Sequence, residues 1–129
     1  MKDDKLWKAF SQFIRLRDSN ADGYGKCFTC ERVIHYTDGD CGHGIGRQHK
    51  ATKFDERNNH LQCKKCNGFE GGQQAIYKEE VERLYGTGTW NDIVLKSKQI
   101  VKRTQAEINE LENHYKEKVK ELKKTKGIS

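Results

Sequence analysis

Two cysteine pairs, Cys27-x-x-Cys30 and Cys63-x-x-Cys66, constrain this chain more than any other feature of its sequence. A C-x-x-C pair brings two thiolates within reach of one tetrahedral zinc ion, and two such pairs complete a closed four-sulfur site. The alternative is four unrelated free thiols, but the paired spacing favours zinc. Because a closed site has no open coordination position, this zinc would be structural and not catalytic. The 32 residues between Cys30 and Cys63 exceed a compact zinc ribbon and predict a hairpin inserted between the pairs.

The composition explains why a bound metal would help this chain to fold. Its 129 residues are enough for one domain with a modest core, yet only 33% are hydrophobic and 34% are charged. A structural zinc stabilises such a polar chain because its binding free energy contributes to folding. The fifth cysteine, Cys41, is left over; we expect it to pack as a small apolar side chain, with a spare thiol as the alternative.

The charge balance favours a polyanionic partner. The chain has 25 Lys and Arg against 19 Asp and Glu, a net charge of +6, which favours nucleic acid, although ordinary solubility also explains such a balance. Residues 1–8 lack the apolar stretch of a signal peptide, and no run approaches the roughly 18 apolar residues of a membrane span. We therefore expect a cytoplasmic protein without membrane contact, where thiolates bind metal rather than form disulfides.

Periodicity and turn residues predict short elements of both kinds, and therefore an α+β fold. Residues 4–17 have the pattern of an amphipathic helix, which the Asn, Asp and Gly of residues 18–23 end. Residues 33–36 read as a short strand that turns at 37–39 and returns over 40–46 as a hairpin. The other predicted segments are an irregular basic stretch at 47–57, an extended stretch at 60–62, and helices at 63–69, 73–85 and most of 91–126.

Two of these helices carry apolar positions that need a partner surface. In the helix at 73–85 they are Ala75, Ile76, Val81 and Leu84. In the C-terminal tail they recur at spacings of three and four: Ile100, Thr104, Ile108, Leu111, Tyr115, Val119 and Leu122. This tail stripe predicts either docking on the core or a coiled-coil homodimer seam.

Together these patterns describe one domain over residues 1–129. Residues 1–24 form its N-terminal helical part, residues 25–72 its zinc-stabilised core, and residues 73–129 its helical C-terminal part.

The segment between and just after the cysteine pairs concentrates residues suited to phosphodiester hydrolysis. That reaction needs a base that activates water, a cation that stabilises the charge on the phosphorane, and donors that hold the phosphate. His43 fits the base, and Asn67 and Asp40 offer the oxygen ligands that magnesium prefers. A helix that begins near Cys63 would add positive potential for the phosphate at its N-terminus.

The same segment resembles the HNH, or ββα-metal, nucleases. Residues 40–67, which read DCGHGIGRQHKATKFDERNNHLQCKKCN, are similar to the signature of the lambda-type phage NinG (Rap) family of recombination endonucleases. The resemblance extends over the flanking helices. It implies a small ββα-metal (HNH-like) core flanked by an N-terminal helix and long C-terminal helices. It also implies that His43 is the base, that Asn58 braces the loop from the central Asn position, and that Asn67 is a metal ligand.

One position departs from the family pattern. Many HNH sites carry an Asp or His metal ligand directly before the base, and here that residue is Gly42. The cation would then be held by Asn67 with water and phosphate. Alternatively, Asp40 supplies the missing carboxylate if the glycines bend the strand, because residues 40 and 43 otherwise face opposite sides. His43 could itself be a ligand rather than the base.

Further polar residues complete the candidate site. His49 could bind phosphate or donate a proton to the leaving group, and His60 could act directly, although both have ordinary structural explanations. Six basic residues lie where a phosphate backbone would have to run: Arg47, Lys50, Lys53, Arg57, Lys64 and Lys65. No pattern resembles a base-reading code, so we expect recognition of backbone and shape.

The sequence thus predicts a metal-dependent endonuclease that hydrolyses phosphodiesters in branched or junction recombination DNA, with structural Zn²⁺ and catalytic Mg²⁺ or Mn²⁺. The preference for branches rests on the resemblance alone. The alternatives are a non-catalytic zinc-containing DNA-binding module and an HNH nuclease that nicks duplex DNA. Recombination proteins are candidate partners, and a homodimer through the C-terminal helix would give a resolvase two active sites.

Overall fold

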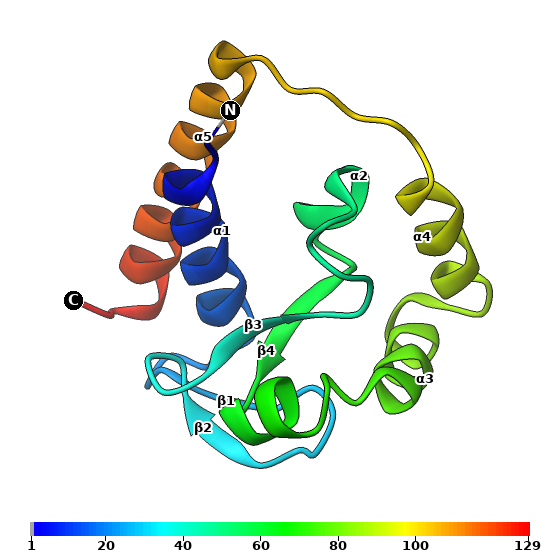
Figure 1. The fold of residues 1–129 in the computed structure, drawn as a ribbon. Helices are drawn as coiled ribbons and strands as arrows, with labels where there is room; N and C mark the ends of the chain where they lie inside the picture. Colours follow the sequence, from blue (N-terminus) through cyan, green and yellow to red (C-terminus); the bar gives the residue numbers. More distant parts are fainter. Residues whose placement is uncertain (1) are drawn as a thin grey trace.

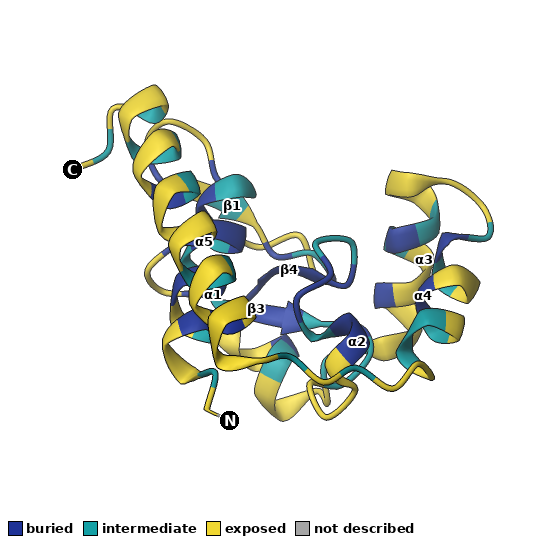
Figure 2. Cartoon of the chain, turned by 90° about the horizontal axis from the view of Figure 1, so that it is seen from above, coloured by how far each residue is buried: buried dark blue, intermediate teal, exposed yellow. Residues whose placement is uncertain are grey.

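The computed structural model describes residues 2–129 and has helices packed around two small antiparallel sheets, which agrees with the predicted α+β class (Figure 1). The elements are α1 (Asp4–Arg17), β1 (Tyr24–Lys26), β2 (Val33–His35), β3 (Asp40–His43), α2 (Lys50–Lys53), β4 (Asn59–Gln62), the π-helix η1 (Lys65–Phe69), α3 (Gln74–Tyr85), α4 (Thr89–Ser97) and α5 (Gln105–Lys126). The buried β3–β4 ribbon lies between two helical flanks, α1 with α5 and α3 with α4 (Figures 1 and 2).

The α1–α5 pair builds the larger hydrophobic core. Leu6, Phe10, Phe13 and Ile14 share one face of α1, and all four are buried, as the periodicity predicts. From α5, the ring of Tyr115 meets Phe10 edge-on with 4.9 Å between the ring centroids. Such edge-to-face pairs are favoured over parallel sandwiches because the positive edge of one ring meets the negative face of the other.

The predicted stripe on the tail is used inside the chain. Its members in or against the α1 core are Ile108, Leu111, Tyr115, Val119 and Leu122. Most of residues 91–126 are helical, as predicted, but the helix is interrupted: α4 ends at Ser97, residues 98–104 are irregular, and α5 begins after its N-cap Thr104, which forms a capping box with Glu107. Ile100 lies in that irregular segment and is 91% exposed. Of the two alternatives, docking on the core is the one that the structure shows, and this face of α5 is not free as a dimer seam.

Strand pairing differs from the predicted hairpin. The sequence predicts that residues 33–36 pair with 40–46, and this prediction is wrong. β2 pairs with β1, so that Val33 lies opposite Lys26, whereas β3 pairs with β4, so that His43 lies opposite Asn59. The N–H of Cys27 donates to the carbonyl of Arg32 at 2.8 Å, which folds β1 back on β2 around the first cysteine pair.

A second hydrophobic cluster joins α3 and α4. Its buried members are Tyr77, Val81 and Ile93, with Phe28, Ile45 and Trp90 packed against them. The predicted apolar face of α3 is partly wrong, because Ile76 is 38% exposed and Leu84 is 54% exposed. None of the helices in residues 2–129 is long and apolar enough to cross a membrane.

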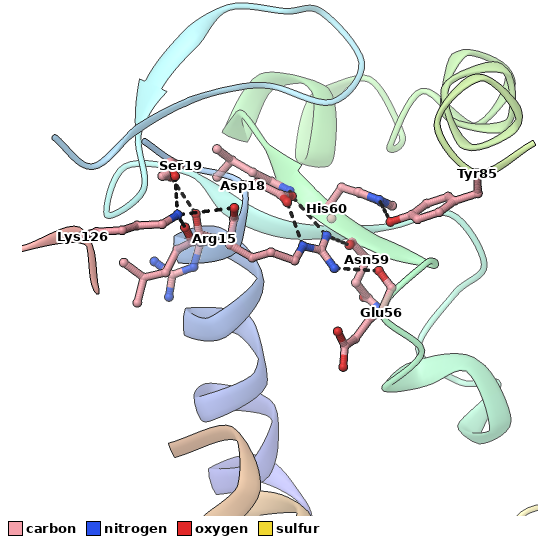
Figure 3. A network of polar contacts seen from close by, with 12 residues as sticks. Arg15, Asp18, Ser19, Glu56, Asn59, His60, Tyr85 and Lys126 are labelled. Carbon is pink, nitrogen blue, oxygen red and sulfur yellow. Dashed lines mark hydrogen bonds and ion pairs between the residues drawn. The ribbon is translucent and has the colours of Figure 1, made fainter. Parts of the chain in front are cut away.

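Polar contacts around the C-terminal end of α1 tie distant segments together (Figure 3). The ammonium of Lys126 donates to the carbonyl of Leu16 at 2.6 Å and also to the carbonyl of Ser19, where a cation stabilises a helix C-terminus. The guanidinium of Arg17 donates to the carbonyl of Asn59 at 2.7 Å. These bonds fix α1 relative to both α5 and β4.

Candidate functional site

The four paired cysteines converge although they come from different elements. Cys27 follows β1 and Cys30 precedes β2, whereas Cys63 follows β4 and Cys66 lies in η1. Their Sγ atoms all lie within 4.8 Å of one another, and those of Cys30 and Cys63 are 3.7 Å apart. Zn–S bonds of about 2.3 Å in a tetrahedron require S–S edges of about 3.8 Å, so this donor set fits a zinc ion.

The backbone around Cys27 favours the thiolate form that binds metal, whereas burial raises the pKa of Cys30 in the same pair. Burial raises the pKa of Cys27, but backbone N–H groups of Cys63 and Cys30 and the Thr29 hydroxyl outweigh burial and lower it to about 6. The turn closes through Glu31, which has a left-handed φ of 63° and whose N–H donates to the carbonyl of Cys27 at 3.0 Å.

A separate pocket of about 270 Å³ gathers the residues predicted to carry the chemistry. It is lined by Trp7, Asp40, Cys41, His43, Arg47 and Asn67. Asp40 and His43 are the two ends of β3 and are half-buried, whereas the two residues between them are buried. Strict alternation along a strand would point the side chains of Asp40 and His43 to opposite sides. Because they are the end residues of a strand of only four, the alternation is not kept there, and both side chains line the pocket. Asn67 reaches the pocket from η1, and such π-helical turns often occur at functional sites.

Asp40 provides the negative charge of this pocket. The Asn67 amide nitrogen donates to Asp40 Oδ2 at 3.1 Å, and Lys64 Nζ pairs with Asp40 Oδ1 at 2.7 Å. A divalent cation would take the place of the Lys64 ammonium, with Asp40 and the amide oxygen of Asn67 as ligands. This requires that Lys64 leaves Asp40 and that the Asn67 amide turns over, and Mg²⁺ would complete its coordination with water and phosphate oxygens.

His43 lies in the pocket as a neutral imidazole. Burial and the neighbouring positive charge of Arg47 hold the pKa of His43 below its ordinary value of 6.5. A neutral imidazole can accept a proton from water at neutral pH. The guanidinium of Arg47 stacks on Trp7, 4.6 Å from the ring centroid, which holds a positive charge beside His43.

Packing explains the glycine directly before His43. A Cβ atom at Gly42 would lie 1.9 Å from Oε1 of Gln62, which is fully buried. The Gln62 amide nitrogen donates to Thr29 Oγ1 at 3.0 Å and to the carbonyl of Gly72 at 2.9 Å, so the side chain has little freedom to move. A carboxylate ligand at position 42 is therefore excluded by this packing, and Asp40 supplies the carboxylate of the pocket.

Asn58 braces the loop that follows His43. Its side chain is fully buried, and its amide nitrogen donates to the carbonyls of Ile45 at 3.0 Å and Thr52 at 3.2 Å. Its amide oxygen accepts from the N–H of Ile45 at 2.8 Å. Because its side-chain donors and acceptor are all used by backbone groups of the fold, Asn58 has a structural role and does not act on a substrate.

The other two candidate histidines lie outside the pocket lining. His60 is 2% exposed, and its Nδ1 lies 3.0 Å from the hydroxyl of Tyr77. Its Nε2 lies 2.9 Å from the hydroxyl of Tyr85 (Figure 3). Its ring stacks on Phe28 with 3.8 Å between centroids. Both ring nitrogens are hydrogen-bonded inside the fold, which favours the structural explanation of His60 over a direct chemical role. His49 is exposed and is the N-cap of α2.

Four of the predicted basic residues, Arg47, Lys64, Lys50 and Lys53, lie at the pocket or along a groove next to it. Arg47 lines the pocket, Lys64 reaches in to pair with its carboxylate, and Lys65 is exposed at the start of η1. Lys50 and Lys53 lie with Arg47 along a neighbouring groove.

Arg57 lies apart from these basic residues. Three other residues near the site are not predicted from the sequence: Trp7, Lys102 and Arg103. Arg57 Nη2 donates to Asp55 Oδ2 at 3.1 Å, an ion pair in which the carboxylate is buried. Trp7 lines the pocket, although the periodicity of α1 only places it beside the apolar face. Lys102 and Arg103 line the neighbouring groove from the α4–α5 connection, and no local pattern marks their approach.

Comparison with known proteins places the chain in one family. The sequence model described as Bacteriophage Lambda NinG protein matches residues 2–125. Searches of the curated proteins and of the solved structures gave no match. Because the family match spans the helical flanks as well as the cysteine cluster and the His43 pocket, the chain belongs to the bacteriophage lambda NinG protein family.

Proposed function

We propose that this chain is a metal-dependent DNA endonuclease of the HNH type. The observation that carries the proposal is the pocket that a neutral His43 shares with Asp40 and Asn67, two side chains whose oxygens would bind a cation. A base beside a cation site is the combination that phosphodiester hydrolysis requires. The basic residues Arg47 and Lys64 at the same pocket would attract a phosphate.

The element order supports an HNH-like core. In the ββα-metal arrangement, an antiparallel pair of strands is followed by a helix that carries a metal ligand. Here β3 and β4 form the pair, and η1 follows with Asn67. In the proposal, zinc at the four cysteines clamps η1 to the β1–β2 hairpin and holds Asn67 in place.

In the proposed reaction His43 accepts a proton from the attacking water. Arg47, held by the Trp7 ring, donates to a phosphate oxygen, and Lys64 moves from Asp40 to the phosphate. A divalent cation such as Mg²⁺ or Mn²⁺, when bound by Asp40 and Asn67, supplies charge stabilisation for the phosphate and the leaving oxygen.

The preferred substrate in this proposal is branched or junction DNA, for which the support is the family resemblance. The residues of the pocket support phosphodiester hydrolysis alone. Cutting two opposed strands would use two active sites, so the proposal includes a homodimer. It also includes recombination proteins as partners, for which the support is again the family resemblance. The dimer contact would involve a surface other than the α5 face that packs on α1.

The test is cleavage of an end-labelled branched DNA and of its matched linear duplex, with and without Mg²⁺ or Mn²⁺. We expect the wild type and His49→Ala to cut the branch only with metal, and His43→Ala to bind without cutting. Cutting by His43→Ala at the wild-type rate would remove His43 as the base. Equal cutting of the linear duplex would favour a nicking nuclease.

A non-catalytic DNA-binding module is the second candidate. It is favoured by the Lys64–Asp40 ion pair, which fills the place of the cation with a side chain of the protein. Binding without cutting by the wild type in both metals would establish this alternative.

A further inference from the structure

A basic groove of about 430 Å³ lies next to the His43 pocket and shares Arg47 with it. Most of its lining comes from the segment around α2 and from the α4–α5 connection, with Asp3 and Ile108 completing it. Figure 1 shows this connection, residues 98–104, passing from one helical flank to the other above α2. We call this groove the strap groove, and its polar lining residues are Asp3, Arg47, Gln48, Lys50, Lys53, Lys102 and Arg103.

The charge of the strap groove is almost entirely positive. The one carboxylate in its lining, Asp3, already pairs with Lys53 at 2.8 Å. Within residues 2–129, Lys50, Lys102 and Arg103 have no carboxylate at ion-pair distance. Cations gathered without counter-charge repel one another, and a bound polyanion relieves that repulsion.

The walls of the groove are held by specific contacts. The guanidinium of Arg103 lies over the Phe54 ring, 5.3 Å from its centroid, and its Nη1 donates to the carbonyl of Lys50 at 3.0 Å. On the other side, Trp7 holds Arg47. Because these contacts fix side chains that would otherwise be mobile, less conformational entropy is lost when a ligand binds.

We propose that the strap groove binds the sugar–phosphate backbone of the DNA strand that leaves the His43 pocket. The expected ligand is a run of nucleic-acid phosphates, because the groove is lined by several separate Lys and Arg side chains that can each bind one phosphate of a repeating backbone. Lys102 and Arg103 bring to this contact a part of the chain remote from the pocket in sequence, and Arg47 serves both sites. The assignment of the strand's origin rests on the proposed function, whereas binding by the groove requires no catalysis.

The experiment measures affinity for a fluorescent branched DNA in EDTA, over a series of salt concentrations, by anisotropy. The variant is Lys50→Ala with Lys102→Ala, since neither change removes a side-chain hydrogen bond that the structure contains among residues 2–129. The matched control is Lys120→Ala with Lys124→Ala, two exposed lysines of α5. Thermal melting confirms that both double variants fold.

We expect the groove variant to bind roughly tenfold or more weakly near 0.1 M salt, with a log–log salt slope smaller by about 2, and the α5 control to match the wild type. The proposal is overturned if the groove variant keeps the affinity and salt slope of the wild type. It is also overturned if the α5 control loses as much affinity for DNA as the groove variant does.

Cleavage assays on the same proteins separate the two proposals. If the wild type cuts DNA and the groove variant binds like it, the groove proposal fails and the endonuclease stands. If the groove variant loses binding and no protein cuts, the endonuclease fails and the groove stands. A wild type that does not bind DNA overturns both.

Discussion

Replacing His60 by glutamine should remove part of the acid sensitivity of this fold. His60 is 2% exposed, and burial lowers its pKa from 6.5 to about 3, with Asp18 opposing and Arg17 adding to the shift. Tyr77 lies 3.1 Å from both the Gly42 and Asn58 carbonyls, to which it donates, so its oxygen accepts from Nδ1–H of His60. Nε2 then accepts from the Tyr85 hydroxyl, and the folded state holds a neutral imidazole.

The sign and size of the effect follow from the two pKa values. Because the folded-state pKa lies below the unfolded value, the unfolded chain takes up the proton first as pH falls. The stabilisation is complete above about pH 6.5 and is lost progressively down to about pH 3. At about pH 5 the loss is roughly 2 kcal/mol, a large fraction of the 5–15 kcal/mol that is typical of a folded domain. His43, whose pKa is also lowered, contributes in the same direction.

The assay is urea unfolding at about pH 7.5 and about pH 5 for the wild type, His60→Gln and His114→Gln. Acid also protonates cysteine thiolates, but this contribution is common to all three proteins and cancels in the difference. We expect His60→Gln to be less stable at the higher pH and to lose roughly 2 kcal/mol less on acidification. Exposed His114 is the matched control and should keep the wild-type loss. An equal loss in the wild type and in His60→Gln would refute the reasoning.

Four further outcomes are expected. Asn58→Ala should lower the free energy of unfolding by about 3 kcal/mol, because the buried backbone groups of Ile45 and Thr52 lose their hydrogen-bond partner. The exposed control Asn113→Ala should change it little, and similar values for both variants in urea unfolding would contradict the bracing role. Lys126→Met should lower the free energy of unfolding by about 1 kcal/mol, because the carbonyls at the end of α1 lose the hydrogen bonds from its ammonium. Lys124→Met is the control, and an unchanged melting temperature of Lys126→Met would contradict this prediction. Gly42→Ala should destabilise strongly because its Cβ meets Gln62, and a stable variant would show that this packing is soft. Chelation of bound metal should speed hydrogen exchange in β1, β2 and η1 before α1 and α5, and simultaneous exchange would exclude a local clamp.

Local spacing predicts much of the candidate site. The C-x-x-C pairs indicate convergence because thiolates that share a metal must meet wherever the chain runs between them. Residue type and motif position single out Asp40, His43 and Asn67, and the structure places all three in one pocket. Whether Asp40 and His43 share a side could not be predicted, because it depends on how far a four-residue strand keeps its alternation.

Pairing and helix phase could not be predicted for a related reason. Strands of three or four residues carry too little alternation to choose a partner, and β3 takes β4 from beyond a loop that Asn58 braces. On α3, Ile76 and Tyr77 are both apolar enough to face inward. The choice falls on Tyr77 because its hydroxyl reaches the Gly42 carbonyl at 3.1 Å, a contact between residues far apart in sequence.

The two sides of the His43 pocket are held by different parts of the fold, and this has a consequence for the metals. Asp40 and His43 belong to β3, which pairs with β4 and rests on α1. Asn67 follows Cys66 directly, so its position depends on the cysteine cluster. Loosening the cluster would carry Asn67 away from Asp40 while His43 stays in place. In the proposed enzyme, the structural zinc would thus control affinity for the second cation without touching the base, and loss of zinc would first weaken metal-dependent activity and only later the fold.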